Sequence, residues 1–152
     1  MIEQPKITKF NKPECLTIKT RDSLFSMGKY IKQLKKIAKL HGAKPVGPPF
    51  VIYYEAPDDP KDVEYQVYLP VDTRLEGKTM SFIGGLCGSI LIKGSIKQFE
   101  EAHNTLNDFI EINGHERVGP LIVVYVKGPI FGIIPFYPSM ITEFYLPLKP
   151  ED

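Results

Sequence analysis

The sequence predicts an α+β fold in which two strand-helix-strand-strand modules share one antiparallel sheet. We expect both helices on one face of that sheet and a cleft along a pseudo-twofold axis. Three observations favour this fold. The chain repeats itself, each copy has one helical pattern among several strand patterns, and 14 prolines and 12 glycines imply many turns. The composition, 43% hydrophobic and 24% charged over 152 residues, is typical of a soluble globular domain.

The internal repeat is the most informative feature. A shift of 72 positions aligns the first half of the chain with the second, and later in each copy the shift becomes 77. The matching residues are Leu34 with Leu106, Gly42 with Gly114, Val46-Gly47-Pro48 with Val118-Gly119-Pro120, and Tyr68-Leu69-Pro70 with Tyr145-Leu146-Pro147. Such changes of spacing are tolerated in loops. We therefore divide one domain, residues 1–152, into module one at about 7–72 and module two at about 78–149.

In module one, alternating apolar residues predict a strand at 15–20. Apolar residues at helical spacing follow from Leu24 to Ala38, and Gly42 and Pro45 end that helix. Residues 50–54 and 63–71, separated by a proline- and aspartate-rich turn, predict a hairpin.

Module two repeats the plan, with strands at 89–93, 121–126 and 142–148. Its helix begins at Ser95, which with Gln98 resembles a capping box, and ends at Gly114. The glycines at 84–88 lie between the modules and predict a kink or bulge. A copy of about 70 residues has a marginal core by itself, so we expect the two to pack together.

Composition excludes several function classes. The formal net charge is +1, so the whole molecule gives no electrostatic sign of binding nucleic acid or a membrane. Cys15 and Cys87 are too few and too isolated for a disulfide framework, and no histidine pair has metal-ligand spacing. We expect reduced thiols in the cytoplasm, no metal and no cofactor. The N-terminus lacks the apolar core of a signal peptide, and no apolar run has the roughly 18 residues that a membrane helix needs.

The two predicted helices differ in charge. The first carries Lys29, Lys32, Lys35, Lys36 and Lys39, and the second carries Glu100, Glu101, Asp108 and Glu111. Two solvated faces are one interpretation, with at most about 1 kcal/mol from any exposed pair. The alternative is that the lysines form a basic patch for an anionic partner.

Aromatic residues supply the candidate binding site. Tyr53 and Tyr125 are one repeat-related pair, and Tyr68 and Tyr145 are another. They could line a symmetric cleft suited to flat apolar ligands, or half of them could pack beneath the helices. The unusually apolar loop at 128–138, which contains Phe136, is interpreted as a lid or pocket wall. A homodimer contact, a partner-docking segment and ordinary core packing are the alternatives.

The order of motifs resembles a known family. The pattern G-x-x-x-V-G-P-P-F-V-I-Y-Y at 42–54 and T-E-F-Y-L-P-L at 142–148 resemble the GyrI-like small-molecule-binding family, from about Ile7 to Leu148. The family also forms the effector-binding domain of AraC-type and MerR-type multidrug regulators. The resemblance implies a groove on the pseudo-dyad, lined by aromatic residues and often one acid. Its ligands are bulky, hydrophobic and often cationic xenobiotics. Some members hydrolyse cyclopropane-containing compounds, and others antagonise gyrase-directed toxins.

One departure from the family pattern concerns the acid. Val123 occupies the family's acidic position two residues before Tyr125, and Val51 is its repeat partner. A valine-lined pocket should favour neutral ligands, because a buried unpaired cation is costly. Glu143 could supply the missing charge from the neighbouring strand, or be a structural carboxylate at the sheet end. His103, on the inner helical face, is either an acid or base or a hydrogen-bonded structural histidine.

The leading hypothesis is a stand-alone domain that senses or sequesters a small hydrophobic molecule. The candidate ligand-binding residues are Val51, Tyr53, Tyr68, Val123, Tyr125, Glu143, Tyr145 and Phe136. We assign no catalytic residue. With no helix-turn-helix expected before residue 7, direct contact with nucleic acid is not expected, although a homodimer or a regulator acting in trans remains open. The alternatives are a xenobiotic hydrolase using Glu143 or tyrosine-bound water, and an interaction module using residues 130–137.

Overall fold

The computed structural model describes residues 1–54, 59–127 and 140–151. Within these residues, six strands and two helices follow the predicted order, and a short 3-10 turn precedes each helix. The elements are β1 (Lys6–Asp22), η1 (Leu24–Ser26), α1 (Met27–Leu40), β2 (Phe50–Tyr53), β3 (Val63–Pro70), β4 (Met80–Lys93), η2 (Ile96–Gln98), α2 (Phe99–Ile112), β5 (Ile122–Lys127) and β6 (Ile141–Pro147). The predicted α+β class is therefore confirmed.

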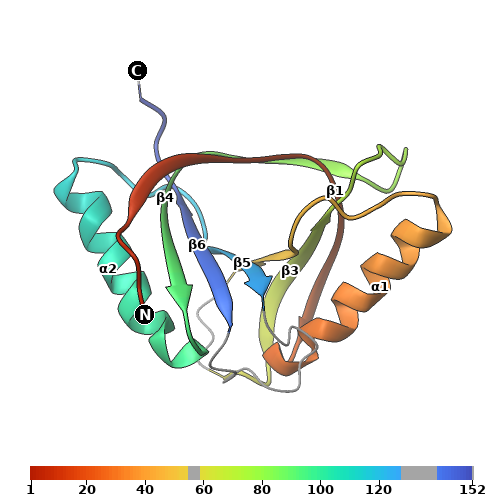
Figure 1. Cartoon of the computed structure of the whole chain (residues 1–152), viewed down its shortest axis with the longest axis horizontal. Helices are drawn as coiled ribbons and strands as arrows, with labels where there is room; N and C mark the ends of the chain where they lie inside the picture. Colours follow the sequence, from red (N-terminus) through yellow and green to blue (C-terminus); the bar gives the residue numbers. More distant parts are fainter. Residues whose placement is uncertain (55–58, 128–139, 152) are drawn as a thin grey trace.

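The six strands form one antiparallel sheet in the order β1-β3-β2-β5-β6-β4. At its centre β2 pairs with β5, and Val51 lies opposite Val123. These two valines are equivalent in the repeat, so the pseudo-twofold axis passes between them. The modules lie on either side of this axis, with α1 and α2 at opposite ends of the molecule (Figure 1).

The register of the strands reproduces the repeat. Cys15 of β1 lies opposite Pro70 of β3, and Cys87 of β4 lies opposite Pro147 of β6. The shifts of 72 and 77 positions seen in the sequence thus correspond to equivalent backbone pairs. Gly42 and Gly114 follow the two helices with φ of 74° and 75°, the left-handed conformation expected of a glycine there.

The helix starts are also equivalent. The hydroxyl oxygens of Ser23 and Ser95 accept hydrogen bonds from the backbone N–H groups of Phe25 and Lys97. The capping box predicted for Ser95 and Gln98 does not form as expected. The Gln98 side chain instead donates to the Lys93 carbonyl and accepts from the N-terminal amine.

The sheet closes on itself, which the sequence does not predict. The predicted strands at 15–20 and 89–93 are only the second halves of β1 and β4. Their first halves pair with each other, from Lys6 opposite Ser89 to Cys15 opposite Met80. Gly84 is the extra residue at a bulge in this pairing, where a Cβ would lie 2.8 Å from the Phe10 carbonyl oxygen. Of the kink or bulge predicted for the glycine segment, the structure has a bulge.

Two apolar layers cover the two faces of the sheet. On the outer, helical face, α1 and α2 pack their apolar stripes on one side of the sheet, and Leu34 and Leu106 are almost fully buried there. The inner face, which the closure encloses, is filled with aromatic rings. There Phe50 stacks on Tyr68 with ring centroids 4.8 Å apart. None of the helices in the described part of the chain is long and apolar enough to cross a membrane.

At two repeat-related positions, the modules divide side-chain volume differently between strand and helix. In module one, Leu16 of β1 and Ala38 of α1 are both buried. At the equivalent positions of module two stand Gly88 and Ile110. A Cβ on Gly88 would lie 2.9 Å from Cγ1 and Cδ1 of Ile110, so the glycine accommodates the larger helical side chain.

We predict that Gly88→Leu and Ile110→Ala each destabilise the protein by about 1–4 kcal/mol, the first by overpacking and the second by leaving a cavity. The double variant recreates the Leu16–Ala38 combination. It should be less destabilised than the sum of the single variants by at least about 1 kcal/mol in urea unfolding. Simple additivity would contradict the proposed exchange.

One buried hydroxyl lies beside the central strands. Thr142 of β6 is fully buried opposite Tyr125, and its Oγ1 has no hydrogen-bond partner among the residues that the structure describes. The equivalent residue of module one is Tyr65, whose hydroxyl donates to the Ser23 carbonyl. Module two therefore lacks both the aromatic ring and its hydrogen bond at this position.

We predict that Thr142→Val stabilises the protein by about 1 kcal/mol, because valine has the same shape and removes a desolvated hydroxyl. Thr17→Val is the matched control. The Thr17 hydroxyl donates to the Val67 carbonyl and accepts from Gln66. That variant should lose about 1 kcal/mol in the same unfolding measurement, and equal effects in both variants would contradict the assignment.

Candidate functional site

The central strands β2 and β5 lie between the two helices. The helix α1 packs mainly against β1 and β3, and α2 packs mainly against β4. Side chains that point to the helical face from β2 and β5 therefore lie near the pseudo-dyad rather than beneath a helix. These side chains are Val51, Tyr53, Val123 and Tyr125.

A hydrogen-bonded tyrosine pair marks the pseudo-dyad. The hydroxyl oxygens of Tyr53 and Tyr125, residues equivalent in the repeat, are 2.6 Å apart. Burial raises the pKa of Tyr125 to about 12 and that of Tyr53 well above its ordinary value. Both phenols therefore keep their protons near neutral pH. One O–H donates to the other oxygen, which leaves one O–H of the pair able to donate elsewhere.

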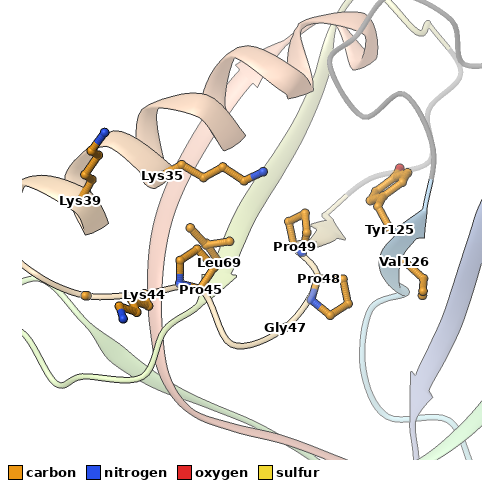
Figure 2. A pocket seen from close by; sticks show the side chains of 11 residues that line it. Lys35, Lys39, Lys44, Pro45, Gly47, Pro48, Pro49, Leu69, Tyr125 and Val126 are labelled. Atoms are coloured by element: carbon orange, nitrogen blue, oxygen red, sulfur yellow. The ribbon is translucent and has the colours of Figure 1, made fainter.

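A cavity of about 570 Å³ lies beside Tyr125 on the module-one side. This volume is within the range of small-molecule sites. The residues that line it are Lys35, Lys39, Ala43, Lys44, Pro45, Gly47, Pro48, Pro49, Leu69, Tyr125 and Val126. Figure 2 shows Pro48 and Pro49 on the side of Tyr125, Pro45 beside Leu69 on the other side, and Lys35 extending from α1 toward Pro49.

The proline-rich wall of this pocket is held in place by backbone contacts. After Gly42 ends α1, the Lys44 N–H donates to the Asp72 carboxylate, and the Val46 N–H donates to the Pro70 carbonyl. The Lys44 N–H also lowers the pKa of Asp72, so this carboxylate stays charged. Three prolines further restrict the segment, because each fixes its own φ. The wall is therefore preformed.

The pocket has one sign of charge. Lys35, Lys39 and Lys44 line it, and the described lining contains no aspartate or glutamate. The repeat does not share this charge, since the equivalent residues of module two are Asn107, Glu111 and Glu116. The backbone of the groove is thus nearly symmetric, whereas its electrostatic potential is not.

The structure divides the predicted site residues between two faces. Tyr68 and Tyr145 belong to the inner aromatic layer, where Tyr145 lies 4.5 Å from the Phe10 ring. Glu143 lies opposite Val124, so it shares the inner side with that residue, whereas Val123 points to the helices. Of the two alternatives for Glu143, the register disfavours a carboxylate in place of the acid at Val123, and its part in ligand binding stays a prediction. Phe136 and the whole 128–138 segment lie outside the described residues.

The sequence-based site also missed residues. The pocket-lining lysines and prolines are not among the candidate ligand-binding residues, although Lys35 and Lys39 belong to the five lysines of the first helix that could form a basic patch. The sequence feature that could have predicted this lining is the lysine-rich helix followed directly by the V-G-P-P segment. Only the path of residues 43–49 brings the two together.

The buried thiols and His103 show no sign of activation. Burial raises the pKa of both Cys15 and Cys87 to about 11, the opposite of an activated thiol. His103 Nε2 is 3.1 Å from Nη1 of Arg117. Because a guanidinium only donates, Nε2 accepts and the imidazole is neutral. No group of three or more metal-ligating side chains occurs among the residues described.

His103 predicts a pH dependence of stability. Burial, and secondarily the charge of Arg117, lower its pKa below the ordinary value of 6.5. The unfolded chain therefore takes up a proton before the folded protein does, and the free energy of unfolding falls as the pH drops below about 6.5 through the folded pKa. His103→Gln removes this contribution.

We predict that the stability difference between wild type and His103→Gln shrinks between pH 7.5 and pH 5. Chemical unfolding at each pH measures it, and the other titrating groups cancel in the comparison. A difference that is constant with pH would show that the histidine has the same pKa in the folded and unfolded states.

Comparisons with known proteins concern the fold. A scan of family models and a search of curated proteins found no match. Among solved structures, the chain is similar to EcmrR in an EcmrR–DNA complex, with a TM-score of 0.64 and 18% identity over 97% of this chain. The chain spans 58% of that EcmrR chain. It spans 99% of the EcmrR C-terminal domain solved separately, with the same TM-score and identity.

Two further structures have the same fold. A hydrolase from Listeria innocua matches with a TM-score of 0.74 and 14% identity, over 96% of this chain and 92% of the other. SAV2435 bound to tetraphenylphosphonium matches with a TM-score of 0.57 and 12% identity, over 97% and 94% of the two chains. At these identities the matches show the fold alone. The chain has the fold of the EcmrR C-terminal domain, which is the fold that the resemblance to GyrI-like domains predicts.

Proposed function

We propose that this protein binds a small hydrophobic molecule in the groove between α1 and α2, and so senses or sequesters it. The observation that carries the proposal is the tyrosine pair on the pseudo-dyad, beside a preformed cavity of about 570 Å³. Prolines, Leu69 and Val126 provide an apolar lining, and Tyr125 adds an aromatic ring with a polar tip. This combination suits a rigid, largely apolar ligand.

The structural neighbours include a ligand-bound protein and a protein named a hydrolase, and the residues of this chain favour binding. SAV2435 was solved with tetraphenylphosphonium, and EcmrR was solved in complex with DNA. The Listeria protein is named a hydrolase. Hydrolysis here would need a general acid or base, yet position 123 is valine and Glu143 shares the opposite side of the sheet with Val124. The raised pKa values of Tyr53 and Tyr125 also make them poor bases near neutral pH.

We predict that Tyr53→Ala and Tyr125→Ala each weaken binding of the neutral dye Nile red by about 1–3 kcal/mol, roughly 5- to 150-fold, through loss of an aromatic contact or its support. Fluorescence titration gives the affinities. Tyr54→Ala is the matched control, because Tyr54 is exposed and its hydroxyl donates to Gln66 rather than to the tyrosine pair. If both test variants fold and bind like the wild type, the groove is not the site.

A further inference from the structure

We propose that the pocket selects hydrophobic ligands that carry a negative charge, with Lys35 and Lys39 as the groups that recognise it. This inference rests on the proposed function and deepens it by naming the ligand class. It differs from the expectation of a neutral ligand, which followed from Val123 alone.

The first argument is the position of the lysines. Lys35 and Lys39 are one helical turn apart on α1, so they project from the same side of the helix, and both line the cavity. Lys35 extends over the pocket in Figure 2. Lys44 adds a third positive charge from the proline-rich wall. All three lysines are exposed, so their combined attraction for an anion acts through solvent and weakens as salt is added.

The second argument is the sign of the whole lining. A ligand cation in this cavity would lie beside three lysines and no carboxylate of the described lining. Val123, at the centre of the sheet, offers it no compensation and is itself fully buried. The cost of desolvating a cation would therefore be unopposed. An anionic ligand would instead be attracted by the three lysines.

The third argument is the hydrogen-bonding capacity of the tyrosine pair. Tyr53 and Tyr125 stay protonated, and their mutual hydrogen bond uses only one of their two O–H groups. The remaining O–H has no acceptor among the described residues, and Tyr125 is the member of the pair that lines the cavity. A carboxylate or sulfonate accepts hydrogen bonds and donates none, whereas an ammonium group only donates. The pair thus matches an anionic group and mismatches a cationic one.

The size of the cavity restricts the partner further. A volume of about 570 Å³ accommodates a small organic molecule. The aliphatic stems of the lysines and the proline rings can cover its apolar body while the ammonium groups reach its charge. The geometry therefore points to an amphipathic organic anion, with a flat apolar body and one carboxylate or similar group.

The test uses three fluorescent probes with one apolar body and different charges: 1-pyrenecarboxylate, 1-pyrenemethanol and 1-pyrenemethylammonium. We expect the carboxylate to bind at least tenfold more tightly than the ammonium compound at low ionic strength. The difference should shrink as salt is added, because exposed charges are screened. The double variant Lys35→Met/Lys39→Met should lose at least fivefold in carboxylate affinity and less than twofold in pyrenemethanol affinity.

Lys36→Met is the control variant. Lys36 is on the same helix and does not line this pocket; it lines a neighbouring hollow on α1 that Lys35 and Lys39 also line. Its loss removes one positive charge from the helix, against two in the double variant, without changing the residues that line the pocket. Equal affinities for the three probes, tighter binding of the ammonium probe, or a loss in Lys36→Met as large as in the double variant would overturn the charge selection and leave the binding function intact. If no probe binds, the proposed function itself fails.

Discussion

The pairing of β2 with β5 is the interaction on which the groove depends. Val51 and Val123 face each other across the pseudo-dyad, and this short antiparallel pair joins the modules at one seam, while the first halves of β1 and β4 join them at the other. Each module would have a marginal core alone. The pairing of β2 with β5 also fixes the distance between the helices, because each helix packs on the other strands of its own module. The central strands are consequently left without a helix above them. A groove with repeat-related residues at its base follows from that arrangement.

The second theme is that a symmetric backbone carries asymmetric side chains. Leu16 and Ala38 are exchanged for Gly88 and Ile110, so the packed volume is shared differently between strand and helix. The charges diverge in the same way, since Lys39 of one module corresponds to Glu111 of the other. Backbone pairing constrains the path of the chain but not the charge of exposed side chains, so the two halves of the groove differ in charge. The cavity beside Tyr125 on the basic side reflects that divergence.

Local residue patterns and the repeat predict most helices and strands of this protein. The pairing of strands that are far apart in the sequence could not be predicted from them. The helices, both hairpins and the equivalence of Tyr53 and Tyr125 follow from periodicity and from matching residues. The closure of the sheet does not, because it depends on the first halves of β1 and β4, where polar residues and glycines weaken the strand signal. The side of the sheet on which Glu143 lies could not be predicted from the sequence either. It depends on the register between β5 and β6, and a slip of one residue reverses the face.

The two faces of the sheet differ in what chemistry they permit. The inner face has its space filled by stacked and edge-on rings such as Phe10, Phe50 and Tyr68, and its two thiols have raised pKa values. Its side chains hold the two halves together and are poorly placed to meet a ligand. The helical face has a preformed cavity, neutral phenols and lysines. Lysines and neutral phenols can hold a ligand through charge and hydrogen bonds without a reactive group, so the same features that define the groove favour binding over catalysis.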